Sequence, residues 1–258
     1  MERLAVDLGN SRIATGYFRD LELLEKWYHP LSSVDGAFQK IDDLQKQKQG
    51  SLEVIISSVV PSTTGRLLEL LGRSKINHSL IRLDSQSIIG NTYPTMGTDR
   101  LANLVAAHKL HGEKNVALVV LDFGTATTLS AVGPDGVFLG GMITLGLKNT
   151  LTSVNSTLEQ LPILDFDEEF DSATLSPLAL TTDQAILNGT IIGHLGMVER
   201  WLHSCRQYLD LPIKTVATGG LARLIAKHID KVSIIDEDLT LKGINLLGAP
   251  AGGQADRG

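Results

Sequence analysis

Two aspartates that each stand two residues before a glycine are the residues of this sequence best suited to phosphate chemistry. Asp7-Leu8-Gly9-Asn10-Ser11 follows an apolar run, and Asp122-Phe123-Gly124-Thr125-Ala126-Thr127-Thr128 follows another about half a chain later. An aspartate placed here can hold a metal ion, directly or through water. The glycine lets backbone N–H groups approach a phosphate closely, and the small polar side chains add hydrogen bonds. Two such turns facing each other can clamp a triphosphate, because phosphoryl transfer needs mainly positioning and neutralisation of charge.

A third motif, Thr218-Gly219-Gly220, ends an expected strand and opens an expected helix. Tight glycine turns at helix N-termini suit the close approach of a nucleotide. Each motif alone is more often a plain turn, whereas the repeated Asp-x-Gly unit together with Thr-Gly-Gly favours a nucleotide site. Neither Gly-x4-Gly-Lys followed by Ser or Thr nor Gly-x-Gly-x-x-Gly is present. ATP binding would therefore use a two-lobed site.

Gly97-Thr98-Asp99-Arg100 supplies candidate catalytic and substrate-binding groups. Thr98 is expected to cap a helix over 98–111, which puts Asp99 and Arg100 in its first turn. The helix dipole favours an acidic residue at this position and disfavours a cation. Arg100 is therefore expected to have a function there, which is to bind an anionic substrate through the paired N–H groups of its guanidinium. Asp99 can then accept a proton from a substrate hydroxyl.

The elements expected to position these motifs are duplicated along the chain. Apolar runs predict strand–turn–strand units at 4–8 and 13–18 and again at 116–121 and 129–132, where a third strand at 137–139 completes a meander. Further strands are expected at 54–58 and 213–217, and helices at 63–71 (capped by Ser62), 98–111, 147–161, 182–203 and 221–228. The duplication predicts an α/β protein with two related lobes and a cleft between them. We place the lobes at 1–112 and 113–250, a disordered tail at 251–258, and a surface loop at Asp165–Asp171.

The composition is that of a globular protein, with 43% hydrophobic and 20% charged residues among 258. A formal net charge of -6 without a long basic run argues against nucleic acid or an anionic membrane as partner. No stretch approaches the roughly 20 apolar residues that span a bilayer, and the N-terminus does not read as a signal peptide. Cys205 is the single cysteine, so no intrachain disulfide can form. We expect a soluble, cytoplasmic protein.

Taken together, the motifs resemble those of the type III pantothenate kinase family. The resemblance runs from Asp7 to about Leu247 in order and approximate spacing, and it includes Gly140-Gly141. It implies an actin-like ATPase fold with two ribonuclease-H-like lobes. It also implies that ATP phosphorylates the primary hydroxyl of pantothenate to 4'-phosphopantothenate, the first step of coenzyme A biosynthesis.

Two other functions are also compatible with these motifs. One is a different kinase, or a phosphohydrolase, on the same fold, because a fold alone fixes no substrate. The other is a non-catalytic nucleotide-binding regulator, since some relatives of the family were described as accessory factors for gene expression. The presence of Asp7, Asp99 and Asp122 favours an enzyme.

The resemblance also implies roles for single residues. Asp99 would be the general base and Arg100 would hold the pantothenate carboxylate, with Gly97, Thr98 and Tyr93 as further substrate contacts. Tyr93 precedes Gly97 by a spacer one residue shorter than is usual in the family. Thr182, in the segment Thr182–Gly189, would reach the pantothenate of a neighbouring subunit in a homodimer; the alternative is that it caps its own helix.

Contacts to ATP are implied on both lobes. The residues are Asp7, Leu8, Gly9, Asn10, Ser11 and Arg12 in the first phosphate loop, Gly124, Thr125 and Thr127 in the second, and Gly219 beyond them. Asp122 would hold a monovalent cation, K⁺ or NH₄⁺. Mg²⁺ would accompany ATP, with Asp7 as a ligand.

Overall fold

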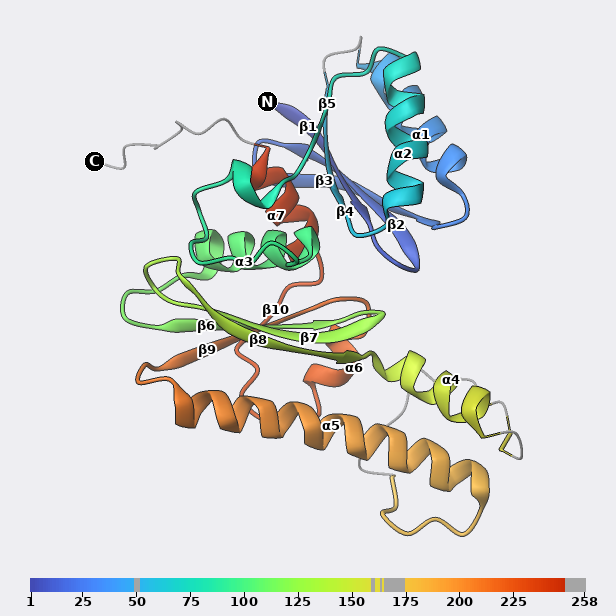
Figure 1. The fold of residues 1–258 in the computed structure, drawn as a ribbon, viewed down its shortest axis with the longest axis vertical. Helices are drawn as coiled ribbons and strands as arrows, with labels where there is room; N and C mark the ends of the chain where they lie inside the picture. The colour runs from blue at the N-terminus through green and yellow to red at the C-terminus, as the bar shows by residue number, and fades with distance from the viewer. Residues whose placement is uncertain (49–51, 159–160, 163, 165–174, 249–258) are drawn as a thin grey trace. The chain divides into compact units, whose positions relative to one another are not determined.

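The chain folds into two compact units, each built around one five-stranded sheet (Figure 1). The computed structural model describes residues 1–48, 52–158, 161–162, 164 and 175–248. The first unit comprises Met1–His111 and the segment that starts at Asp238, and the second comprises Gly112–Glu237. The expected α/β class and the duplication of one strand pattern are therefore confirmed. The expected tail at 251–258 and the acidic loop Asp165–Asp171 lie outside the described residues.

The sheet of the first unit has the strand order β3-β2-β1-β4-β5. Strands β1 (Glu2–Leu8), β2 (Arg12–Arg19) and β3 (Glu22–Pro30) form an antiparallel meander, while β4 (Glu53–Ser58) and β5 (His78–Leu80) continue from β1 in parallel. A parallel step needs a crossover connection, and α1 (Val34–Gln47) and α2 (Pro61–Arg73) supply the two that this half of the sheet requires. A short 3-10 helix, η1 (Leu83–Ser85), follows β5.

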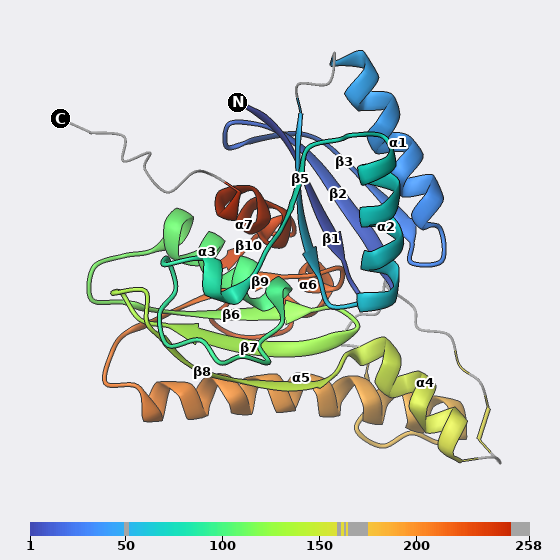
Figure 2. The same ribbon diagram turned by 45° about the horizontal axis from the view of Figure 1, so that its top comes forward.

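Helices cover both faces of this first sheet (Figures 1 and 2). Alternate residues of β1, such as Leu4 and Val6, are fully buried against the face that α1 and α2 cover, where Ile41 and Leu67 also lie. The opposite face carries α3 (Thr98–His111) and α7 (Leu239–Leu247), which pack on each other and on the parallel strands. Both faces are thus closed, as a buried parallel pair requires.

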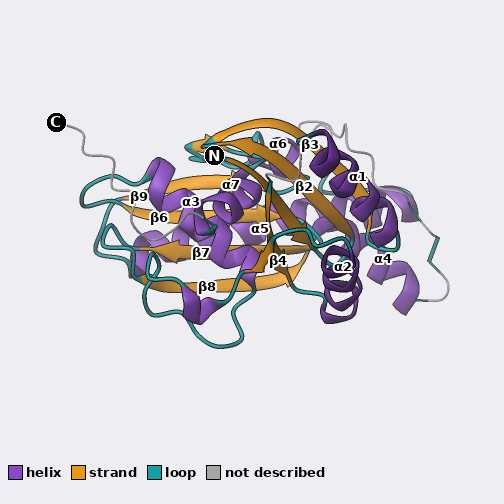
Figure 3. Cartoon of the chain, turned by 90° about the horizontal axis from the view of Figure 1, so that it is seen from above, coloured by secondary structure: helices purple, strands orange, loops and turns teal. Residues whose placement is uncertain are grey.

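The sheet of the second unit repeats this design with the order β10-β9-β6-β7-β8. Its central strand β6 (Ala117–Phe123) is antiparallel to β7 (Ala126–Val132), which is antiparallel to β8 (Phe138–Leu145). On the other side β9 (Ile213–Thr218) and β10 (Ile234–Ile235) run parallel to β6. Figure 3 shows β9, β6, β7 and β8 side by side in this order. Strands β1 and β6 therefore occupy equivalent central places.

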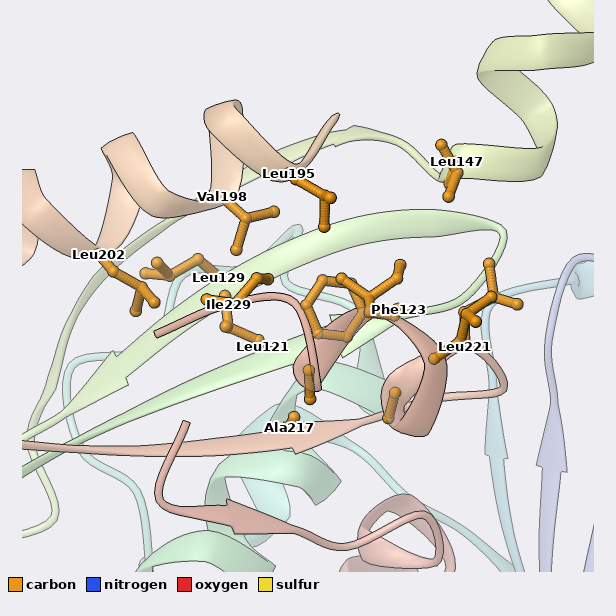
Figure 4. Packing of buried hydrophobic residues seen from close by; sticks show 14 of the residues in the cluster. Leu121, Phe123, Leu129, Leu147, Leu195, Val198, Leu202, Ala217, Leu221 and Ile229 are labelled. Carbon is orange, nitrogen blue, oxygen red and sulfur yellow. The ribbon is translucent and has the colours of Figure 1, made fainter. Parts of the chain in front are cut away.

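The core of the second unit lies between its sheet and the helices α5 (Thr182–Tyr208) and α6 (Ala222–Ala226). Phe123, Leu121 and Leu129 point from the sheet toward this layer (Figure 4). Leu195 and Val198 meet them from α5, which presents one apolar stripe to the sheet. Helix α4 (Leu147–Thr157) packs beside α5.

The expected starts at Thr98 and Thr182 are confirmed, but three expected helix caps differ in the structure. Helix α2 begins at Pro61 after Val60, so Ser62 lies inside the first turn and is not the cap. Thr98 is the first residue of α3. Helix α5 is capped by Thr181, whose hydroxyl accepts the Gln184 N–H at 3.4 Å, and Thr182 is its first residue. At α5 the neighbouring residues Thr181 and Thr182 are equally good caps, so the sequence cannot choose between them.

The second unit also ends earlier than the expected lobe 113–250. It ends at Glu237, because α7 packs against α3 and β1 of the first unit. Among the described residues, none of the helices combines the length and the apolar character needed to cross a membrane.

Candidate active site

The first Asp-x-Gly turn connects β1 to β2. Asp7 stands directly opposite Ala14 of β2 and Ser57 of β4, and the turn is closed by a hydrogen bond from Gly9 N to Arg12 O of 3.0 Å. The side chains of Asn10, Ser11 and Arg12 are exposed, whereas that of Leu8 is buried in the core. Leu8 can therefore offer a ligand only its backbone.

The N-terminus of α3 is fastened beside this turn by the hydroxyl of Thr98. Thr98 Oγ1 lies 2.9 Å from Ser57 Oγ, accepts the Ser58 N–H at 3.1 Å and reaches the Ser58 carbonyl oxygen at 3.1 Å. Because Ser57 is the neighbour of Asp7 in the parallel pair, this anchor brings the start of α3 to the same sheet edge as Asp7. Ligands of open α/β sheets bind at this carboxyl edge of parallel strands.

Asp99 follows this anchor and is mostly buried. Its Oδ1 accepts the backbone N–H of Arg100 at 2.7 Å. Burial raises the pKa of the Asp99 carboxyl above its ordinary range, and the Arg100 N–H and guanidinium offset only part of this rise. A raised pKa makes the ionised carboxylate a stronger proton acceptor, which suits a general base.

Gly97 makes room for this carboxylate. A Cβ at position 97 would lie 2.3 Å from Asp99 Oδ1, well inside van der Waals contact. A side chain here would therefore push the Asp99 carboxyl out of its place.

Arg100 and Tyr93, two expected substrate contacts, lie together. The Arg100 side chain is buried, and its Nη1 donates to Tyr93 Oη at 2.5 Å. Tyr93 itself is partly exposed. A buried guanidinium that is held by a phenol hydroxyl is oriented in advance for a planar anion such as a carboxylate.

The second Asp-x-Gly turn has the same place in the second unit. Asp122 stands opposite Thr128 of β7 and Thr218 of β9, and Gly124 N donates to Ala126 O at 3.0 Å. The start of α4 holds this turn in place. Thr125 O accepts hydrogen bonds from Gly146 N and Asn149 Nδ2, each 2.9 Å long. Gly124 and Thr125 are the exposed residues of the turn.

Gly219 packs against this turn with a backbone conformation that residues other than glycine rarely adopt. Its φ is +93°, and a Cβ would lie 2.4 Å from Asp122 Oδ1 and 2.7 Å from the backbone N and C of Phe123. The Thr-Gly-Gly motif is thus in direct contact with the Asp-x-Gly motif of the same unit. The sequence suggested that both serve a nucleotide, and the structure joins them.

The row Thr128–Asp122–Thr218 crosses three strands on one face of the sheet, since directly paired residues share a face. Thr218 is fully buried, and its Oγ1 has no hydrogen-bond partner within the described part of the chain. A carboxylate flanked by hydroxyl oxygens is a donor set that suits a hard cation. No cluster of three or more His, Cys, Asp or Glu side chains that could hold a metal occurs among the described residues. Any cation here would therefore rely on this mixed set.

Thr127 points away from that row. Its side chain is fully buried, and its hydroxyl lies 3.0 Å from Nε2 of His194 on α5. Thr128, the next residue, is the one whose side chain shares the face of Asp122. Sequence reasoning gave Ser57 and His194 no role, because their contacts depend on strand register and on packing between elements distant in sequence.

Thr182 lies at the exposed start of α5, in the first turn after the capping residue Thr181. The capping alternative for Thr182 is therefore wrong.

Comparison with known proteins gives a consistent set of matches. A family model described as "Type III pantothenate kinase" matches residues 3–204. The type III pantothenate kinase of Rubrobacter xylanophilus is 31% identical over 260 residues, covering 95% of this chain and 96% of the relative.

Two solved structures share the fold. A protein described as a Baf family transcriptional activator from Campylobacter jejuni has a TM-score of 0.58 at 22% identity, covering 95% of this chain and 96% of that one. The inorganic polyphosphate/ATP-glucomannokinase of an Arthrobacter strain has a TM-score of 0.53 at 13% identity, covering 95% and 97%. At these identities the likeness concerns the fold alone, which is the two-lobed, actin-like ATPase fold expected from the sequence.

Proposed function

Because the chain belongs to the type III pantothenate kinase family, we propose that it transfers the γ-phosphoryl group of ATP to the primary hydroxyl of pantothenate. The product is 4'-phosphopantothenate, and the reaction is the first step of coenzyme A biosynthesis. The observation that carries this conclusion is the family match over residues 3–204. The chain is thus an ATP-dependent kinase, and the alternative of a non-catalytic regulator is not favoured.

Asp99 is the proposed general base. Its mostly buried carboxylate would accept the proton of the pantothenate hydroxyl as that oxygen attacks the γ-phosphorus. Arg100, oriented by Tyr93, would pair with the pantothenate carboxylate and so fix the far end of the substrate. Gly97 and Thr98 act on Asp99 by making room for it and by anchoring its helix.

Each unit carries one candidate phosphate-binding turn in this proposal. In the first unit the backbone around Gly9 and the side chains of Asn10, Ser11 and Arg12 offer donors to phosphate oxygens. In the second unit the exposed turn at Gly124 and Thr125 would face the phosphates, with Gly219 packed against it. Asp7 would serve the Mg²⁺ that accompanies ATP, whose charge offsets that of the phosphates when it is bound.

The row Thr128–Asp122–Thr218 is the proposed site of a monovalent cation, K⁺ or NH₄⁺. Its support is the buried Thr218 hydroxyl that has no hydrogen-bond partner among the described residues. One carboxylate with two hydroxyls carries a single negative charge, which a monovalent cation neutralises.

A homodimer is the proposed assembly. In the second unit, Leu178 and Leu180 are 83% and 97% exposed just before α5, and Ile143 and Leu145 are more than half exposed on β8, which is an edge strand. Large apolar side chains that are exposed to this extent are typical of a protein–protein interface. Thr182 follows Leu180 closely, so the same surface would bring it to a neighbouring subunit's pantothenate. The cytoplasm, where ATP is made available, is the proposed location.

The test of the function is direct product analysis. Purified protein is mixed with Mg-ATP, K⁺ and pantothenate, and 4'-phosphopantothenate and ADP are measured by mass, with Na⁺ in place of K⁺ as one control. Product that requires pantothenate is expected. ADP formed without pantothenate would instead indicate a phosphohydrolase, and nucleotide binding without any turnover would indicate a regulator.

A further inference from the structure

Thr127 and His194 form a buried polar pair that the proposed chemistry leaves unused. Thr127 is fully buried, and His194 is 6% exposed in the middle of α5. Their hydroxyl oxygen and Nε2 lie 3.0 Å apart. The α5 residues beside His194 that face the sheet are apolar, with Ile191, Leu195 and Val198 all in the core cluster (Figure 4 shows the last two). Burial lowers the pKa of the His194 ring, which keeps the imidazole neutral.

This pair lies directly behind the phosphate turn of the second unit. Thr127 is the second residue of β7 and stands opposite Phe123, the last residue of β6. Between them the chain makes only the turn Gly124-Thr125 and Ala126, whose carbonyl closes the turn with Gly124 N. A tether on Thr127 therefore restrains the backbone N–H groups that the turn presents.

We propose that His194 is a positioning residue for ATP, which holds the Thr127 hydroxyl and thereby fixes the phosphate turn at Gly124 and Thr125. The inference rests on the proposed function, in which this turn binds phosphate. A neutral imidazole can accept a hydrogen bond from the hydroxyl or donate one to it, so either tautomer satisfies the pair. Removing one partner leaves the other buried and unsatisfied, which loosens the strand that carries the turn.

The variants Thr127→Val and His194→Leu test this role, because each removes one partner at nearly constant size. We expect each to raise the KM for ATP about threefold to tenfold, the effect of losing one hydrogen bond, and to leave the KM for pantothenate unchanged. The double variant should be no worse than either single variant, because both act through one contact. Thr127→Ser and His194→Gln keep a polar partner and should recover most of the affinity.

A matched control is Thr215→Val, the same change at another fully buried position of the same sheet, in β9 and away from the turn. It should leave the KM for ATP unaltered. Calorimetric Kd values for a non-hydrolysable ATP analogue on the same variants make the test independent of turnover, so a failure of the proposed function is recognised separately.

Two results would overturn the proposal. Unchanged nucleotide affinity in both single variants, with only a lower melting temperature, would show that the pair stabilises the fold and does not position the phosphate turn. Weaker affinity in Thr127→Val alone, or additive losses in the double variant, would mean that the Thr127 hydroxyl contacts ATP itself.

Discussion

Gly97 shows how the absence of a side chain leaves space for the proposed general base, Asp99. Since a Cβ at this position would lie 2.3 Å from Asp99 Oδ1, Gly97→Ala must displace the carboxylate. We expect kcat to fall roughly 10- to 100-fold, because a shift of about 1 Å at a reacting group has effects of this order. The KM for ATP should be unchanged. Steady-state kinetics with both substrates measure the two parameters.

Gly65→Ala is the control for that variant. Gly65 lies in the exposed part of α2, and a Cβ there would meet nothing within 4 Å. This change should leave kcat intact and stabilise the helix by about 0.5–1 kcal/mol. Normal kcat in Gly97→Ala would show that the Asp99 carboxylate does not need its present position.

The raised pKa of Asp99 has a consequence for stability. Burial raises the pKa in the folded state above the value of about 3.9 in the unfolded chain. The ionised carboxylate therefore destabilises the fold at pH values above the folded pKa. This penalty decreases as the pH falls below the folded pKa and is gone below the unfolded pKa. Asp99→Asn should raise the melting temperature at pH 8 and give no gain near pH 3.5. A gain that is equal at both pH values, or absent at pH 8, would contradict burial as the dominant influence.

At the scale of elements, the start of α3 is positioned by its bond to β4. The Thr98 hydroxyl contacts Ser57 and the backbone of Ser58, so it joins the helix of Asp99 to the strand beside Asp7. Thr98→Val would leave these polar groups without their partner, at a cost of about 1–3 kcal/mol in the free energy of unfolding. Turnover should fall as well, while Thr98→Ser should preserve both. Urea unfolding and kcat measure the two effects, and a Thr98→Val protein with wild-type kcat would refute the anchoring role.

The elements themselves were largely predictable from the sequence. The hairpins around Asp7 and Asp122 and the meander that follows Asp122 come from apolar runs broken by turn residues, and the structure confirms them. The face on which a side chain lies was not predictable where two hydroxyl residues adjoin. Thr127 and Thr128 have the same chemistry, and only the pairing of Asp122 with Thr128 decides which of them faces the proposed cation site. The caps at Thr181 and Val60 lie one and two residues before the expected ones, because helix periodicity does not fix the residue at which a helix begins.

At the scale of the whole molecule, the duplicated motif predicted two units, but the path of the chain between them was not evident. The sequence after Glu237 carries no motif that assigns it to either half. In the structure α7 returns to the first unit and lies on α3 so closely that a Cβ at Gly243 would be 1.9 Å from the Ala102 carbonyl oxygen. A contact between residues this distant in sequence depends on packing, which periodicity does not reveal.

This close contact gives a prediction for the first unit. Gly243→Ala should destabilise it by about 1–3 kcal/mol, because the clash is with backbone that cannot rotate away. Gly196→Ala, an exposed position of α5 where a Cβ meets nothing within 4 Å, is the matched control and should not destabilise. Thermal unfolding of both variants measures the difference. Equal melting temperatures of the Gly243→Ala and Gly196→Ala proteins would mean that stability does not depend on the close packing of α7 on α3.

The most direct test of the account is the turnover of Asp99→Asn with pantothenate and ATP. The variant keeps the shape of the side chain and the oxygen that accepts the Arg100 N–H, but it cannot take up the substrate proton. We predict a loss of kcat of about 10²–10⁴-fold, with the melting temperature at pH 8 raised and the Kd for ATP unchanged. A folded Asp99→Asn protein that still makes 4'-phosphopantothenate at nearly the wild-type rate would contradict the role of Asp99 as the base.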